Sequence, residues 1–286
     1  MTDYHDIKAI KLGAKNNEVP LVVIGYGAYI QKLEEELRQT RPVWMFMLPN
    51  HVEFYLWKGD SGFLTVENIA SFYCDLIVKH IPDTKIILTG YSFFGLIAFE
   101  MAYQLNEAGL EVELVILFDT FLENGHRFQL PERMIYFFRH GKPKMAFEHL
   151  FLYLSKKIQK KKSVLLHQPP PKGSDLNQSS GNIKQWTESR HYIDWMECGP
   201  VLVKIRELAM RCYNIKPLAC KGILFKVYLT ENDILNGGLV DHGWSKQFKG
   251  GLQIIFTEGD HGSMVQPPHD LVLAKKMKEV LAVHNF

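Results

Sequence analysis

Short apolar runs alternate with amphipathic helical patterns along this chain from residue 20 onward. Runs of this kind are typical of buried strands, and an apolar residue every three or four positions is typical of helices packed on a sheet. Strands that are linked through helices pair in parallel, and the helices then cover both faces of the sheet. The pattern predicts strands at 21–24, 43–48, 85–88, 114–118, 222–229 and 252–256, and helices at 29–40, 66–80, 93–107, 201–213 and 270–282.

The alternation predicts one α/β domain over residues 1–286, interrupted at approximately 121–200. The interruption is rich in aromatic residues, carries the basic run KKIQKKK at 156–162, and continues into QPPPKGSDLNQSSGN at 168–182. This last stretch has the composition of a loop, with little to bury. An insertion of this length, after a strand that ends in an acid, predicts a helical lid.

Composition and charge narrow the class of protein. The formal net charge is +2, which does not indicate a nucleic-acid-binding protein. The four cysteines show no C-x-x-C pair and no metal-ligand spacing with histidine, so we expect free thiols and no metal centre. The first residues lack the apolar core of a secretory signal, and no uncharged apolar run reaches the roughly 18 residues of a membrane span. We therefore expect a cytoplasmic protein without a membrane span.

The stretch TGYSFFGLIAFE, at residues 89–100, places a Gly-x-Ser between a predicted strand and a predicted helix. A serine on such a turn can act as a nucleophile when a base takes its proton and hydrogen-bond donors stabilise the oxyanion that forms. Ser92 is the nucleophile of this hypothesis. In the common motif a glycine stands two residues after the serine, whereas this chain has Phe94 there and Gly95 one place later.

Asp119 and His261 complete the groups that a nucleophilic serine needs. Each follows a predicted strand, and the chain order Ser, Asp, His is that of the α/β-hydrolase fold. Taken singly, a serine before a helix is more often an N-cap, an aspartate after a strand a turn residue, and a loop histidine a surface residue. The three together, at the carboxyl ends of strands in one sheet, favour a catalytic triad.

The oxyanion donors and the acid can be assigned in more than one way. The backbone N–H of Phe93, at a helix start, is one expected donor, and Tyr26 in the first loop is expected to supply the other. Many α/β-hydrolases carry the acid after the next strand, where YLTENDIL places Asp233 as the alternative to Asp119. Asp260, next to the histidine, is expected to be a turn residue.

Phe94 raises a question of packing at this turn. Small residues flank a nucleophilic serine because its backbone is strained and its helix lies close to neighbouring strands. The ring fits if a facing residue is small, such as Gly27 or Ala28 of the first loop, and the pocket is then altered. Otherwise the serine is displaced by ~1 Å, and such a displacement can lower the rate about a hundredfold.

Two segments resemble the thioesterase domains of nonribosomal peptide and polyketide synthases. They are GYSFFGLIAFEMAYQLNEAGLEVELVILFDT at 90–120 and GWSKQFKGGLQIIFTEGDHGSMVQPPH at 243–269. The family typically has GYSFGG at the serine, a strand ending in Leu-Phe-Asp-Thr or similar, and Gly-Asp-His before a small residue. This chain departs at Phe94 and, with IGYGAY, in the first loop, and the two departures face each other in the hydrolase fold. The resemblance implies an α/β-hydrolase fold with a mostly parallel sheet, flanking helices and a lid.

The resemblance also implies the chemistry of a type I thioesterase. An acyl chain would pass from the phosphopantetheine of an acyl or peptidyl carrier protein to Ser92, with His261 as base and then acid and Asp119 orienting it. Water or a nucleophile within the acyl chain would release the product, by hydrolysis or cyclisation. The expected partners are the carrier protein and the small-molecule acyl chain, and no cofactor other than the carrier's phosphopantetheine is implied.

Two other functions remain open on the sequence. The same triad would serve a hydrolase of free esters or acyl-CoA, and Phe94 argues for a catalytically impaired module that binds acyl chains or docks carriers. Phe94, Tyr136 and Phe137 are candidates for the substrate pocket, although lid aromatics would equally pack on one another. KKIQKKK either docks an acidic carrier protein or is a solvated helix end.

Overall fold

The computed structural model describes part of the chain, which falls into two compact units. The first comprises Met1–Gly125, Ile193–Tyr228 and Asp241–Phe286, and the second comprises His126–Tyr192 and Leu229–Val240. Nearly all described residues belong to the first unit. The described residues are 8–13, 18–25, 29–47, 65–81, 85–122, 206–228 and 240–283, with isolated positions at 138, 143–144, 147, 150 and 203.

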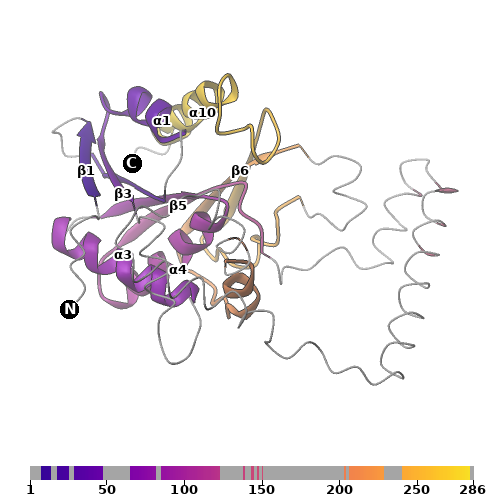
Figure 1. The fold of residues 1–286 in the computed structure, drawn as a ribbon, viewed down its shortest axis with the longest axis horizontal. Helices are drawn as coiled ribbons and strands as arrows, with labels where there is room; N and C mark the ends of the chain where they lie inside the picture. Colours follow the sequence, from indigo (N-terminus) through magenta and orange to yellow (C-terminus); the bar gives the residue numbers. More distant parts are fainter. Residues whose placement is uncertain are drawn as a thin grey trace, which may run out of the picture. The chain divides into compact units, whose positions relative to one another are not determined.

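A mostly parallel, seven-stranded sheet forms the centre of the first unit (Figure 1). Its order is β1-β3-β2-β4-β5-β6-β7, in which β1 runs antiparallel to β3 and the other neighbouring pairs are parallel. The predicted α/β class is therefore confirmed. The strands are β1 (Lys8–Gly13), β2 (Leu21–Ile24), β3 (Pro42–Met47), β4 (Ile86–Tyr91), β5 (Val112–Phe118), β6 (Lys221–Val227) and β7 (Leu252–Thr257).

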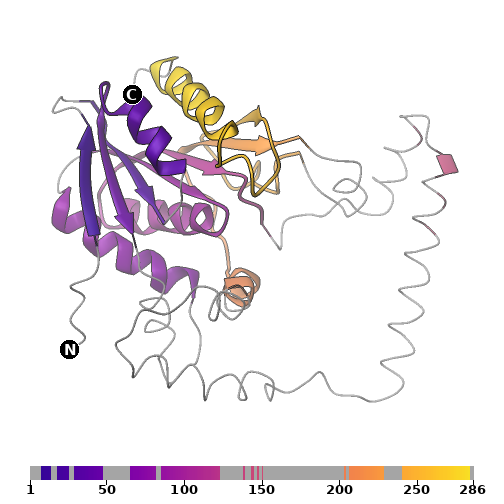
Figure 2. The same cartoon turned by 45° about the horizontal axis from the view of Figure 1, so that its top comes forward.

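Helices cover both faces of this sheet (Figures 1 and 2). α1 (Tyr29–Leu37) and α10 (His269–Val283) pack beside each other on one face, and α3 (Val66–His80) and α4 (Phe93–Glu107) pack beside each other on the opposite face. The central strands β2, β4, β5 and β6 are almost entirely buried, and Ile87 is fully buried on the α1 and α10 face. Because side chains on both faces of these strands are buried, their sequences are mostly apolar instead of alternating.

Most of the predicted helices and strands begin and end within three residues of their predicted bounds, but β1 was not predicted. Its sequence, KAIKLG, has no apolar run, because lysines interrupt the apolar residues. The predicted helix at 201–213 is described at 203 and 206–212 only. The lid predicted at 121–200 lies for the most part outside the described residues, so the lid and the single-domain reading stay predictions.

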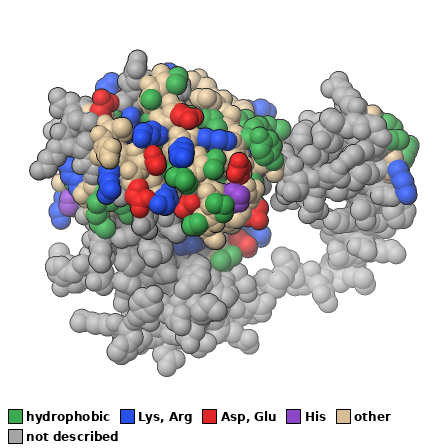
Figure 3. Space-filling model, turned by 90° about the horizontal axis from the view of Figure 1, so that it is seen from above, with side chains coloured by type: hydrophobic (Ala, Val, Ile, Leu, Met, Phe, Trp, Pro, Cys, Tyr) green, Lys and Arg blue, Asp and Glu red, His purple; other side chains and the backbone are tan. Residues whose placement is uncertain are grey.

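The outer surface formed by α1 and α10 carries both signs of charge. Lys and Arg side chains are interspersed with Asp and Glu on this face (Figure 3). Lys32 Nζ lies 2.5 Å from Glu35 Oε2, and Lys278 Nζ lies 3.5 Å from Glu36 Oε2. The described part of this face therefore lacks the single-sign field that attracts nucleic acids.

A buried carboxylate fastens α4 to the segment that leads into β6. Glu100, in the middle of α4, is 5% exposed, and its Oε2 accepts a hydrogen bond of 2.7 Å from the Tyr213 hydroxyl. Its Oε1 accepts from Gln104 Nε2 at 2.9 Å. Burial and the neighbouring Glu100 raise the pKa of Tyr213, so the phenol remains a donor at neutral pH.

Removing the Tyr213 hydroxyl is expected to destabilise the fold. Tyr213→Phe leaves a buried carboxylate oxygen without its donor, which costs about 1–3 kcal/mol in the free energy of unfolding. Urea unfolding measures this loss. Tyr103→Phe is the matched control, because Tyr103 is only half-buried on α4 and its hydroxyl accepts a long contact of 3.4 Å from Lys216 Nζ, so we expect a change within about 0.5 kcal/mol. Equal effects of the two substitutions would contradict the role given to the Glu100–Tyr213 contact.

Candidate active site

Ser92 occupies a tight turn between β4 and α4. Its φ of 53° and ψ of −121° are strained for a residue with a side chain, and strain of this kind clusters at functional sites. Two glycines allow the close approach of helix and strand. A Cβ on Gly90 would lie 2.3 Å from the Phe94 carbonyl oxygen, and a Cβ on Gly95 would lie 1.9 Å from Thr120 Oγ1. The small residue required after the serine is therefore Gly95.

The Phe94 ring fills the space that a side chain on Gly25 would need. A Cβ on Gly25, which follows β2 with a φ of +89°, would lie 2.4 Å from Phe94 Cγ. The small facing residue is thus Gly25, whereas Gly27 and Ala28, the expected ones, lie outside the described residues. The Phe93 and Phe94 rings lie edge to face at 5.9 Å, and the Arg206 guanidinium lies over both rings at 5.4 and 5.2 Å.

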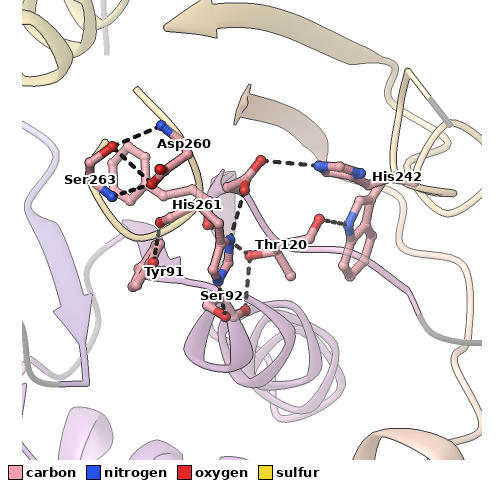
Figure 4. A network of polar contacts seen from close by, with 10 residues as sticks. Tyr91, Ser92, Thr120, His242, Asp260, His261 and Ser263 are labelled. Atoms are coloured by element: carbon pink, nitrogen blue, oxygen red, sulfur yellow. Dashed lines mark hydrogen bonds and ion pairs between the residues drawn. The ribbon is translucent and has the colours of Figure 1, made fainter. Parts of the chain in front are cut away.

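Ser92, His261 and Asp119 form a continuous hydrogen-bonded chain (Figure 4). Ser92 Oγ lies 3.1 Å from His261 Nε2, and His261 Nδ1 lies 2.7 Å from Asp119 Oδ2. An ionised carboxylate only accepts hydrogen bonds, so Nδ1 of this histidine carries a proton and Nε2 is free to accept one from the serine. This polarity allows the imidazole to act as a base toward Ser92.

Asp119 follows β5 and binds a second histidine that the sequence analysis missed. His242 Nε2 lies 3.1 Å from Asp119 Oδ1, and the Asp119 side chain is 6% exposed. Burial alone would raise the pKa of Asp119, but the hydrogen bonds and charges of His242 and His261 hold this pKa well below its usual range. No motif marks His242, because its role depends on a contact between residues far apart in the sequence.

Tyr91, the last residue of β4, supports His261. Its hydroxyl donates to the His261 carbonyl, and the two rings stack with their centroids 5.1 Å apart. Burial, with the charges of Asp119 and Asp260, raises the pKa of Tyr91 to about 12, so the phenol keeps its proton. Asp260 Oδ1 accepts hydrogen bonds from the backbone N–H of Ser263 at 2.8 Å and from its hydroxyl at 2.9 Å, as expected of a turn residue.

The remaining predicted site residues divide into described and undescribed positions. Phe93 is the first residue of α4, where a helix leaves its N–H groups without intrahelical acceptors, so this N–H suits an oxyanion. Four other candidates lie outside the described residues, namely Tyr26, Asp233, Tyr136 and Phe137.

Within the described part of the chain, no group of His, Cys, Asp or Glu is arranged to hold a metal, and no helix is long and apolar enough to cross a membrane.

A serine on a strand–helix turn, with an acid and a histidine after later strands of a mostly parallel sheet, defines the α/β-hydrolase class. Residues 20–133 match the family model of the thioesterase domain. The solved structure of the NocB thioesterase domain from the nocardicin cluster superposes with a TM-score of 0.58 at 18% identity, over 96% of this chain and 98% of that one. Residues 20–133 are therefore similar in sequence to the thioesterase domain, and the chain shares its fold with the NocB thioesterase domain.

Curated relatives are large synthases of which this chain spans a small part. Orsellinic acid synthase armB of Armillaria mellea is 36% identical over 80 residues, which are 28% of this chain and 3% of that protein. Nonribosomal peptide synthetase atqA of Aspergillus terreus is 22% identical over 257 residues, which are 84% of this chain and 25% of that protein. The chain is therefore similar to a part of each of these two proteins.

A side chain at position 25 is expected to destabilise the protein through its clash with Phe94. In Gly25→Ala, overpacking against Phe94 should lower the free energy of unfolding by about 1–3 kcal/mol. The left-handed backbone at this position should lower it by a further amount of about 1–2 kcal/mol, because alanine has a Cβ. In a Phe94→Ala background only the backbone penalty should remain. Gly109→Ala is the control, since Gly109 has a φ of +88° and nothing within 4 Å of an added Cβ. Urea unfolding of the four variants measures the coupling, and an equal cost of Gly25→Ala in both backgrounds would contradict the packing.

Asp119→Asn is expected to lower stability in a pH-dependent way. The carboxyl titrates at lower pH in the folded chain than in the unfolded one. Its contribution is therefore complete above the unfolded pKa of about 4 and is lost as pH falls through the folded value. We expect a loss of about 1–3 kcal/mol at pH 7, which shrinks below about pH 4. Urea unfolding at several pH values measures it, and a difference unchanged down to pH 3 would contradict the depressed pKa.

Proposed function

We propose that this domain is a serine thioesterase that releases a carrier-bound polyketide or peptide acyl chain through an acyl-Ser92 intermediate. The observation that carries the proposal is the continuous chain of hydrogen bonds from Ser92 through His261 to Asp119. The strained Ser92 backbone adds support, because it presents the hydroxyl at the carboxyl edge of the sheet. The similarity to synthase thioesterase domains suggests the substrate class.

In the proposed acylation, Ser92 Oγ attacks the thioester carbonyl while its proton passes to His261 Nε2. Asp119 stabilises the imidazolium that forms, and the Phe93 N–H donates to the oxyanion. Collapse of the tetrahedral intermediate breaks the C–S bond. The proton on His261 then passes to the phosphopantetheine sulfur, which leaves as a thiol.

In the proposed release step, His261 acts as a base a second time. It takes a proton from water or from a nucleophile within the acyl chain, which attacks the Ser92 ester. Hydrolysis gives a carboxylic acid, and internal attack gives a ring. Exclusion of water favours the ring, so residues around the site, including Tyr136 and Phe137 of the predicted lid, would decide between the two products.

The packing of Phe94 supports an enzyme over a catalytically impaired binding module. Impairment would require the ring to displace Ser92, but the ring lies against Gly25 and the serine keeps its 3.1 Å contact with His261. The described residues favour neither a carrier-bound thioester nor a free ester or acyl-CoA. The carrier-bound substrate is preferred here because of the similarity to synthase domains.

Reaction with a fluorophosphonate probe tests the nucleophile. We expect intact mass to show one adduct on the wild type, because the serine and its base are assembled without substrate. Ser92→Ala should abolish the adduct. Ser71→Ala, an exposed serine on α3, is the matched control and should keep it. A folded wild type that stays unlabelled would overturn the serine mechanism and favour the binding module.

Substrate comparison tests the carrier. The same acyl chain is offered on a phosphopantetheinylated carrier protein and on coenzyme A, and kcat/KM is measured for each. Recognition of the carrier surface should raise kcat/KM about tenfold or more for the carrier-bound chain. Equal values would favour the hydrolase of free thioesters while leaving the triad intact.

A further inference from the structure

The two oxygens of the Asp119 carboxylate contact two different histidines (Figure 4). Oδ2 lies 2.7 Å from His261 Nδ1, and Oδ1 lies 3.1 Å from His242 Nε2. The proposed mechanism above uses only the first contact. The second contact is made by Oδ1, the carboxylate oxygen that does not contact His261. Each of the two carboxylate oxygens therefore has a histidine partner.

His242 must be the donor in its contact. An ionised carboxylate accepts but cannot donate, so Nε2 of His242 carries the proton in either charge state of the ring. The side chain of His242 is 15% exposed and that of Asp119 is 6% exposed, so water competes little for this bond. A buried carboxylate oxygen without a donor is costly, and this donor comes from the protein itself.

The backbone around His242 is built to hold the ring in place. Its φ of 49° lies in the left-handed region, which costs free energy for a residue with a side chain. Asp241 holds the turn, because its two carboxylate oxygens accept from the backbone N–H groups of Gly243 and Ser245, each at 3.0 Å. The His242 carbonyl accepts from Leu122 N at 3.1 Å, which ties the turn to the segment after β5.

The same turn is also connected to the nucleophile. Trp244 is fully buried, and its Nε1 donates to the Thr120 carbonyl at 2.8 Å. Thr120 Oγ1 donates in turn to the carbonyl of Ser92 at 3.0 Å. Residues 241–244 therefore contact the acid through one side chain and reach the serine backbone through another (Figure 4).

We infer that His242 is a positioning residue, which holds the Asp119 carboxylate in the rotamer that aligns Oδ2 with His261 Nδ1. This inference rests on the proposed serine mechanism and extends it by a residue that does not touch the substrate. Without a donor on Oδ1, the carboxylate can rotate about its χ angles. Alignment of His261 toward Ser92 Oγ is then lost for part of the time.

The test compares two nearly isosteric substitutions. His242→Gln keeps an N–H donor, whereas His242→Met fills a similar volume without one. We expect His242→Met to lower kcat with a small-molecule acyl thioester about tenfold to a hundredfold, the effect of losing a hydrogen bond to a charged group, with KM little changed. His242→Gln should recover most of this loss. His80→Phe, on α3, is a control that should match the wild type.

A pH profile provides a readout that a merely structural role would not move. Among the described titratable groups, His242, His261 and Tyr91 lie around Asp119, and Asp260 lies near Tyr91 and His261. Loss of the His242 donor raises the pKa of Asp119, because this hydrogen bond favours the ionised carboxylate. The proposed mechanism needs Asp119 ionised, so the acid limb of kcat should move toward higher pH in His242→Met, whereas His242→Gln should remain near the wild type.

Fluorophosphonate labelling separates the failure of this inference from that of the mechanism. If the folded wild type is not labelled, the serine mechanism and this inference both fall. If the wild type is labelled, and His242→Met matches it in kcat and in the acid limb of the pH profile of kcat, only the inference about His242 is overturned. Cooperative unfolding verifies that each variant folds, and His242→Leu replaces His242→Met as the donor-free variant if the latter does not fold.

Discussion

The buried carboxylate of Asp119 is the group on which the arrangement of the site depends. A carboxylate with 6% exposure is stable only when donors satisfy its oxygens, and here two histidines from separate turns do so, one on each oxygen. That requirement brings residues 241–244 and the turn after β7 to the carboxyl end of β5. The second of these turns carries the imidazole that reaches Ser92, so one buried charge organises three segments that are distant in the sequence.

Close packing between β4 and α4 is the second constraint, and it explains how the unusual Phe94 is tolerated. Gly90 and Gly95 bring the backbone of the helix onto the strand, and the ring at position 94 lies in the space beside Gly25. The departure at Phe94 and the departure in the first loop therefore meet at one contact. With the ring in this position, the Ser92–His261 contact stays at 3.1 Å.

Much of this arrangement could be predicted from local sequence. The strands β2 to β7 and the helices α1, α3, α4 and α10 follow from periodicity, because both faces of the central strands are buried and the apolar signal is strong. The order of Ser92, Asp119 and His261 at strand ends predicted their convergence, since parallel strands share one carboxyl edge. β1 escaped prediction because lysines interrupt it, and Gly25 was not singled out because its partner is contributed by another strand–helix turn.

The sequence by itself determined the α/β class, the place of the serine turn and the three residues that meet there. These features are encoded in short patterns of hydrophobicity and in the residue types that a tight turn allows. Only the tertiary structure decided that Gly25 accommodates Phe94 and that His242 binds the second oxygen of Asp119. Both are contacts between segments far apart in the chain, and their distances depend on how helices and turns pack on the sheet, which no local pattern specifies.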